Sequence, residues 1–213
     1  MKLIDPQIPP VLETTEDLMQ LLNAGEDLHE LLIEQQVGTG AATRGVSISA
    51  CSIIKSDLSA MNMENFDIAH TYIKNSNLSG SGFSESGWRS VHIDASRCSG
   101  LQIHDSILKN VRISNSKLDI VNFRFSKIES MVFEDCVLDD VDFYGATLKN
   151  VEFINCTISK ITFATAKMNN VNLSQSEIES IDGVASLKGA TINHDQLMRL
   201  APYFAAEAGI KVA

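Results

Sequence analysis

The stretch "VEFINCTISKITFATAKMNNVNLSQSEIES", residues 151–180, places its largest apolar residues at every fifth position. These residues are Phe153, Ile158, Phe163, Met168, Leu173 and Ile178. The same spacing extends back to Ile48, so that 27 consecutive fifth positions hold an apolar residue or cysteine. An α-helix repeats every 3.6 residues and a β-strand every two, so neither explains a period of five.

A period of five buries one face of the chain only if the chain bends by a fixed angle every five residues. Regular bending in one sense produces a solenoid, in which stacked coils share one apolar column and pair their backbone groups. Two residues before each apolar position, large residues such as Val151 and Ile161 alternate with small ones such as Cys156 and Ala166. Each pair of five-residue units therefore has a large side and a small side.

The composition limits the class of protein. The chain has 213 residues, with 17 Lys and Arg against 27 Asp and Glu, a net charge of −10. Such a charge disfavours direct nucleic-acid binding. We expect no membrane span and no signal peptide, because no apolar run is long enough for either. Four cysteines without CxxC spacing predict a reduced, cytoplasmic protein.

The repeats resemble those of the pentapeptide-repeat family over about residues 46–180. The motif is clearest in "SNLSG" (76–80), "VDFYG" (141–145), "ATLKN" (146–150) and "VNLSQ" (171–175). The sequence departs from the motif at its second position, for example at Arg112 and Val132. The resemblance implies an all-β solenoid, a right-handed quadrilateral β-helix with about 20 residues per coil. Nearly seven coils would form a rod on the order of 30 Å long.

Residues 20 apart would then stack at strand spacing. We expect a column of Phe123, Phe143 and Phe163, a pair of Asn150 and Asn170, and alternating charges at Lys109, Glu129 and Lys149. Cys136 and Cys156 would come within disulfide reach. We favour the alternative that they are small side chains filling a tight column.

Three segments are expected: an N-terminal cap (1–45), the solenoid (46–192) and a C-terminal helical module (193–213). In the cap we expect a short helix with Thr14 as N-cap and Gly25 at its end, then a loop over 38–45. The solenoid should lose one residue near Gly183. In the last segment Asn193 and Gln196 predict a capping box, followed by a break or kink at Pro202 and a stop at Gly209.

The C-terminal segment resembles the module through which topoisomerase-targeting members of the family form two-fold dimers. The resemblance implies a homodimer with candidate interface residues Leu197, Leu200, Tyr203, Phe204, Ile210 and Val212. The alternative is that these residues only cover the last coil.

The most prominent surface feature of the sequence is a band of acids without Lys or Arg between them. Its members are Glu129, Glu134, Asp135, Asp139, Asp140 and Asp142. The band is a candidate site for a basic partner, or an ordinary solvated surface.

No catalytic, metal or cofactor motif is evident, and the five histidines lack metal-ligand spacing. We therefore expect a non-enzymatic scaffold that binds protein partners. The alternative is a DNA mimic that binds DNA gyrase or another type II topoisomerase and protects it from quinolones.

Overall fold

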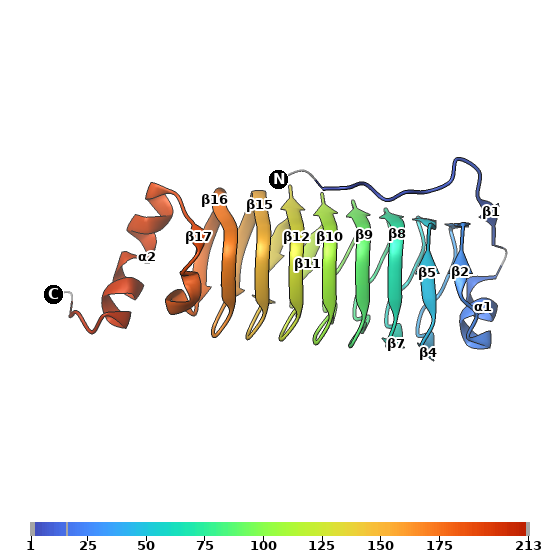
Figure 1. The fold of residues 1–213 in the computed structure, drawn as a ribbon, viewed down its shortest axis with the longest axis horizontal. Helices are drawn as coiled ribbons and strands as arrows, with labels where there is room; N and C mark the ends of the chain where they lie inside the picture. The colour runs from blue at the N-terminus through green and yellow to red at the C-terminus, as the bar shows by residue number, and fades with distance from the viewer. Residues whose placement is uncertain (1–2, 16, 212–213) are drawn as a thin grey trace.

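The computed structural model describes residues 3–15 and 17–211, which coil into a long rod with its strands across the axis (Figure 1). The two α-helices are α1 (Leu18–Ala24) and α2 (His194–Glu207), and a short 3-10 helix η1 spans Val184–Leu187. The strands are β1 (Glu13–Thr14), β2 (Leu28–His29), β3 (Leu31–Glu34), β4 (Ala42–Arg44), β5 (Ser47–Ser49), β6 (Ser52–Ile54), β7 (Asn62–Glu64), β8 (Asp67–Lys74), β9 (Gly87–Asp94), β10 (Ile107–Ser114), β11 (Lys117–Asp119), β12 (Lys127–Glu134), β13 (Val137–Asp139), β14 (Val141–Asp142), β15 (Thr147–Thr162), β16 (Lys167–Asp182) and β17 (Ala190–Thr191).

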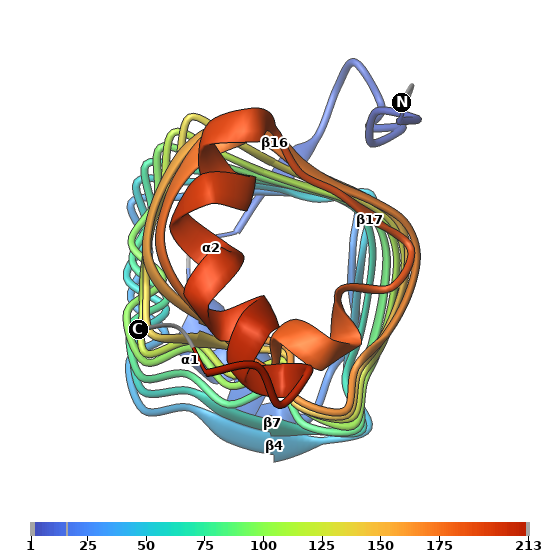
Figure 2. The same ribbon diagram turned by 90° about the vertical axis from the view of Figure 1, so that its left-hand side faces the viewer.

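The strands pair in parallel with partners 20 residues away. Leu108 pairs with Ile128, Ile128 with Leu148, and Leu148 with Met168. This register confirms the predicted repeat of the coil and makes the fold an all-β solenoid of about nine turns. Seen along the rod, the coils superpose on one another, and α2 lies across the last of them (Figure 2).

The bend in each five-residue unit lies at residues whose numbers end in 0 or 5, which we call corner positions. From Glu30 to Asn170, most of these residues have a left-handed backbone with positive φ, such as 60° at Asn110 and 73° at Gly100. An L-residue pays roughly 1–2 kcal/mol for this conformation, whereas Gly and Asn tolerate it. The period of five is therefore the distance between successive left-handed corners.

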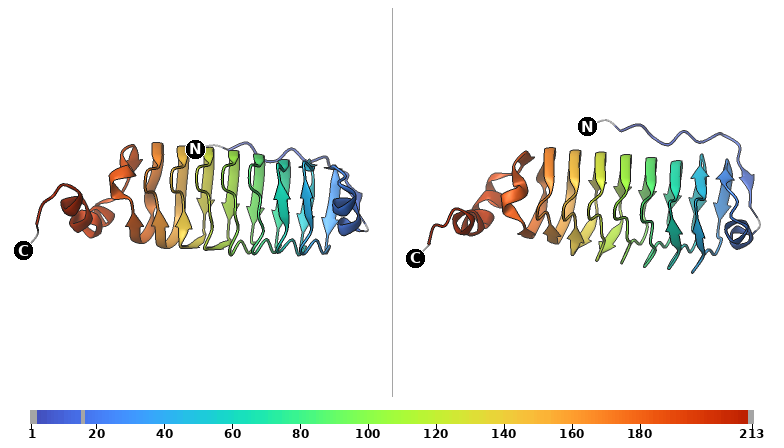
Figure 3. Two further views of the ribbon diagram at one scale, coloured as in Figure 1. Left: turned by 90° about the horizontal axis from the view of Figure 1, so that it is seen from below. Right: turned by 60° about the horizontal axis from the view of Figure 1, so that its bottom comes forward.

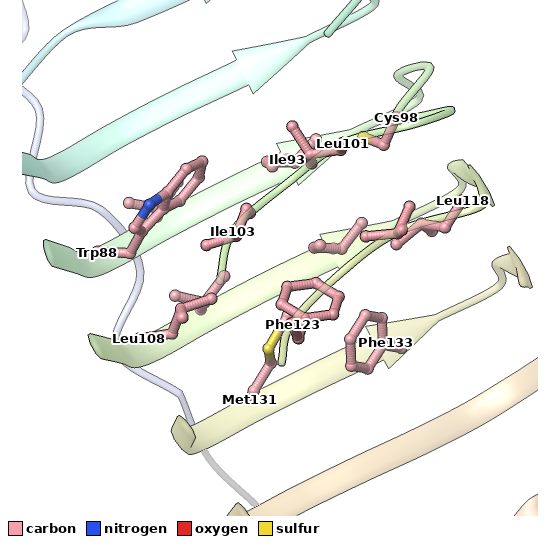
Figure 4. Packing of buried hydrophobic residues seen from close by; sticks show 14 of the residues in the cluster. Trp88, Ile93, Cys98, Leu101, Ile103, Leu108, Leu118, Phe123, Met131 and Phe133 are labelled. Carbon is pink, nitrogen blue, oxygen red and sulfur yellow. The ribbon is translucent and has the colours of Figure 1, made fainter. Parts of the chain in front are cut away.

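The apolar fifth positions fill the interior, where side chains from facing strands meet (Figure 4). Phe143 stacks on Phe123 with ring centroids 5.0 Å apart and on Phe163 at 5.5 Å, as predicted. A second column, Phe133 on Phe153, lies edge-on to the first. The small positions also face inward and carry hydrogen bonds between the coils, because serine hydroxyls there accept from serine N–H groups of the preceding coil.

The strand ladder begins earlier than residue 46. Leu28 already pairs with Ile48 and Ile33 with Ile53, and β4 lies within the segment expected to be a loop. The apolar pattern fails in this first coil because Gly38 occupies an inward position. A side chain there would meet Leu18 of α1 at 3.2 Å, so the helix fills the space that a larger residue fills elsewhere. The estimate of nearly seven coils was therefore too low.

The start of α1 also differs from the prediction. Asp17 caps α1 by accepting a hydrogen bond from the Gln20 N–H at 2.9 Å, so the prediction of Thr14 as N-cap was wrong. Thr14 instead lies in β1, where it pairs with Leu32. The C-cap at Gly25 is confirmed by its φ of 70°.

At the other end the register falls from 20 to 19 residues, since Val171 pairs with Ala190, which confirms the lost residue. The capping box of Asn193 and Gln196 is present. Gln196 is buried and donates to two carbonyls of the last coil, those of Leu173 and Ser176, each at 2.8 Å.

The expected break at Pro202 does not occur, because α2 runs through it to Glu207. Proline removes the hydrogen bond to the carbonyl four residues earlier, and that residue, Met198, is exposed to water. Within the ranges that the structure describes, no helix combines the length and the apolar character needed to cross a membrane.

Candidate interaction site

The acidic residues of the predicted band are spread around the rod rather than gathered on one surface. The corners at Ser130, Asp135 and Asp140 turn the chain between them, so the band encircles a coil. Most of its members are paired with a cation on an adjacent coil. The ion pairs are Glu129 with Lys109 (3.7 Å) and Lys149 (2.7 Å), Glu134 with Arg112 (2.6 Å), Asp140 with Lys160 (2.7 Å), and Asp142 with Arg124 (3.6 Å).

This pairing changes what the band offers to a partner. Lys149 hydrogen-bonds Glu129 and lowers the pKa of that carboxyl, and Asp140 raises the pKa of Lys160 in the same way. The predicted alternation of Lys109, Glu129 and Lys149 is present as a ladder of ion pairs. Because cations and acids alternate along the axis, the field of the band falls off quickly with distance. Binding of a basic partner to the band stays a prediction.

A different group of side chains is brought into contact in the middle of the rod. We call Arg124, Phe125 and Tyr144 the aromatic–arginine cluster. The Arg124 guanidinium carbon lies 4.8 Å from the Tyr144 ring centroid and 5.9 Å from that of Phe125. The two rings meet edge to face at 5.6 Å. These distances are within the range of cation–π and aromatic attraction.

The cluster is held in place from below. The Asp142 carboxylate contacts the Arg124 Nε at 3.6 Å and accepts the Tyr144 N–H at 2.7 Å. The Phe125 ring lies over Gly145, where a Cβ atom would meet it at 2.7 Å. Glycine at that corner therefore leaves the room that the ring occupies.

Phe125 and Ile120 stand out from the other corner residues. Both are exposed, at 53% and 67%, and both are left-handed, with φ of 59° and 54°. A bulky or β-branched residue in this conformation is a genuine outlier. Sequence reasoning missed them because it followed the inward positions. Scanning the corner positions for residues other than Gly, Asn, Asp and Ser is the signal that would have found them.

The residues proposed for a dimer interface divide into two groups. Leu200 is buried and Phe204 partly buried against the core, as expected of a cover on the last coil. Leu197, Tyr203 and Ile210 are 45%, 50% and 61% exposed. Val212 lies outside the described residues. The structure thus assigns two residues to capping and leaves three on the surface.

The cysteines are free and buried, and burial raises the pKa of Cys98 to about 12. Cys136 and Cys156 lie next to each other as predicted, and their shared burial disfavours the thiolate. In the part of the chain that the structure describes, no group of His, Cys, Asp and Glu is placed to hold a metal ion.

Comparisons with known proteins agree with the geometry. The family model for pentapeptide repeats matches residues 116–153 with eight copies. A comparison with curated proteins finds no significant match.

Among solved structures, a trypsin-treated variant of QnrB1, a plasmid-mediated fluoroquinolone resistance protein, matches with a TM-score of 0.63 and 17% identity over 95% of this chain and 94% of that one. Full-length QnrB1 matches with a TM-score of 0.56 and 17% identity over 90% and 94%. HetL, a pentapeptide repeat protein involved in heterocyst differentiation regulation from the cyanobacterium Nostoc, gives 0.40 and 12% over 84% and 97%. The fold and the matched repeats together identify the chain as a pentapeptide-repeat protein.

Proposed function

We propose that this chain is a non-enzymatic, rigid scaffold that binds protein partners, with the right-handed quadrilateral coil of its family. The aromatic–arginine cluster is the observation that carries the proposal. Arg and aromatic residues are enriched at protein interfaces and at their energetic centres. Here such residues are exposed, pre-organised by Asp142 and Gly145, and partly held in a costly backbone conformation. Strain that persists at an exposed site suggests a functional reason.

The fold supports such a role because it holds the cluster rigidly. Arg124 and Phe125 lie one coil from Tyr144, and backbone hydrogen bonds join these coils on both sides of the cluster, as from the Phe125 N–H to the Tyr144 carbonyl at 3.0 Å. The stacked phenylalanines lie directly behind them. A partner that binds there would pay little to order the surface.

Site-specific photo-crosslinking tests the proposal. Benzoylphenylalanine in place of Phe125 keeps an aromatic ring at the corner, and the same residue in place of Thr165 gives a matched control two coils further along that corner. We expect a discrete crosslinked protein from extracts of the source cells at position 125 and not at position 165. Equal adducts at both positions, or none at either, would refute the cluster as a binding site.

We also propose a homodimer through the exposed part of α2, formed by Leu197, Tyr203 and Ile210. An isologous contact of this kind would shield apolar surface at the end of the rod. Light scattering of wild type and of Tyr203→Asp tests this. We expect a dimer that becomes a monomer, and a monomeric wild type at micromolar concentration would exclude the dimer. The buried free thiols are compatible with the cytoplasm.

The second candidate function is binding to DNA gyrase as a DNA mimic, which the likeness in fold to QnrB1 favours. The charge pattern argues against it. A duplex mimic needs acids along the rod, yet one exposed cation per coil runs along one side. This row is Arg89, Lys109, Lys127, Lys149 and Lys167.

A supercoiling assay separates the two functions. Gyrase is measured with and without a fluoroquinolone, in the presence of the purified protein. Under the scaffold proposal we expect neither inhibition nor protection at micromolar concentrations. Protection from the fluoroquinolone would instead support the second candidate.

A further inference from the structure

The N-terminal arm, residues 3–12, runs along the outside of the rod instead of joining a coil (Figures 1 and 3). It leaves the solenoid at β1, which pairs with β3, and extends back over the rod as far as Asn110. On the way it passes the corner residues Ala50, His70 and Ser90. We call the row Ala50, His70, Ser90 and Asn110 the arm corner.

Asn110 binds the backbone of the arm at two points. Its Oδ1 accepts the Ile4 N–H at 2.8 Å, and its Nδ2 donates to the Ile4 carbonyl at 2.6 Å. The same Nδ2 donates to Ser90 Oγ at 2.9 Å, which fixes the amide in place. This is how a neighbouring strand would read a peptide, and it depends on the main chain rather than on the side chain of residue 4. Further along, the Gln7 N–H points to His70 Nδ1 at 3.5 Å.

The arm matches the spacing of the coils. Ile4 and Gln7 are three residues apart and contact corners two coils apart. A polyproline II segment advances about 9 Å in three residues, and two coils span about 9.6 Å. Leu3 is buried and Pro6, Pro9 and Leu12 are partly buried, again at intervals of three, with Ile8 as a further partly buried residue. The arm therefore presents one face of a three-residue repeat to the rod.

The rod beside the arm offers an aromatic surface. Tyr72 and His92 form an edge-to-face pair with centroids 4.7 Å apart, and Asp5 of the arm interacts electrostatically with His92. Aromatic surfaces with hydrogen-bonding groups are what proteins use to bind polyproline II peptides. The arm is also weakly held, because Ile4 is 64% and Val11 82% exposed. Such segments open at low free-energy cost.

We propose that the arm corner is a binding site for extended, proline-containing peptides, and that the arm occupies it in cis. The ligand class is a partner segment with an apolar residue followed by prolines at intervals of three, bound through its main chain by Asn110. Such a segment binds by displacing the arm. The arm competes at an effective concentration in the millimolar range, as short flexible tethers do. This site is separate from the aromatic–arginine cluster and does not depend on it.

Titration with a fluorescent synthetic peptide of residues 3–12 tests the proposal on full-length proteins. Leu3→Asp weakens the arm and leaves the corner intact, and Ile4→Pro removes the N–H donor as a second route to the same end. We expect both variants to bind the peptide at least about tenfold more tightly than wild type does. Adding Asn110→Ala should weaken that binding about tenfold, as expected for the loss of hydrogen bonds worth about 1 kcal/mol each.

The matched control is Asn150→Ala, which changes a corner asparagine two coils beyond Asn110. It should leave peptide binding unchanged. The proposal is overturned if neither weakened arm binds the peptide at millimolar concentration, or if Asn150→Ala and Asn110→Ala weaken binding equally. If light scattering shows a wild-type dimer that Leu3→Asp dissociates, the occupant is the arm of a second copy and the partner peptide is excluded.

Discussion

Replacing Ile120 by asparagine should stabilise the protein, although it removes an apolar side chain from the middle of the solenoid. Ile120 is a β-branched residue at a left-handed corner, with φ of 54°. Asparagine adopts this conformation readily because its side chain can hydrogen-bond locally. The corners at Asn110, Asn150 and Asn170 already use it.

The magnitude follows from strain and burial. Relief of the left-handed conformation is worth roughly 1–2 kcal/mol. Full burial of an isoleucine contributes about 1.5–3 kcal/mol, and Ile120 is 67% exposed, so about 0.5–1 kcal/mol is lost with the side chain. The free energy of unfolding should therefore rise by about 0.5–1 kcal/mol.

Gly100→Ile is the matched control, because Gly100 lies at the same corner one coil earlier. Its φ is 73°, and an added Cβ would lie 3.5 Å from the Gly80 nitrogen, which is an ordinary contact. The new strain is offset in part by about 0.4–1 kcal/mol from the stiffer unfolded chain. We expect a loss of about 0.5–1 kcal/mol by the same strain terms.

Urea unfolding, followed by the fluorescence of the buried Trp88, measures both variants. The reasoning is refuted if Ile120→Asn lowers the free energy of unfolding, or if Gly100→Ile raises it. Either result would mean that the corners of this solenoid carry no strain.

Phe143→Ala should cost about 4 kcal/mol in urea unfolding, because it leaves a cavity between stacked rings. Gln196→Ala should release α2 from the last coil, seen as faster hydrogen exchange in residues 194–207, because two buried hydrogen bonds are lost. Burial, and then Arg112, lower the pKa of His92 below its usual 6.5, although Asp94, Asp5 and Glu134 oppose them. The unfolded state therefore binds more protons, and the stability present above pH 6.5 should be lost as pH falls through the native pKa, more in wild type than in His92→Gln. Cys98, with a pKa of about 12, should resist iodoacetamide at pH 8 until the protein unfolds.

The inward half of the structure was predictable from sequence because each of its positions repeats. The apolar period predicted the solenoid, and the distance of 20 residues predicted the phenylalanine column and the Lys109–Glu129–Lys149 ladder. Prediction failed where an element outside the repeat supplied the packing. Leu18 of α1 stands in for a side chain at Gly38, and the first coil therefore shows no apolar period.

The outward half was harder to predict because it carries no repeat. The acidic band looked continuous along the chain, yet four corners separate its members and cations from adjacent coils pair with most of them. The arm could not be predicted because its contacts, from Ile4 to Asn110, join residues 106 positions apart without strand pairing. Neither the ion pairs nor the arm contacts follow from a pattern within one coil.

This division between the two halves bears on where partners bind. Every coil must fill the same interior, so an inward residue can distinguish one coil from the next only slightly. The axial charge pairs cancel one another at distances beyond a coil or two. A partner can therefore recognise a place on the rod mainly by its exceptions, where a corner residue departs from the small or polar type. Phe125, Ile120 and the arm beside Asn110 are such exceptions, and the first two are kept despite the strain of a left-handed backbone. If Ile120→Asn stabilises the fold, stability cannot be the reason for the isoleucine, and recognition by a partner becomes the stronger explanation.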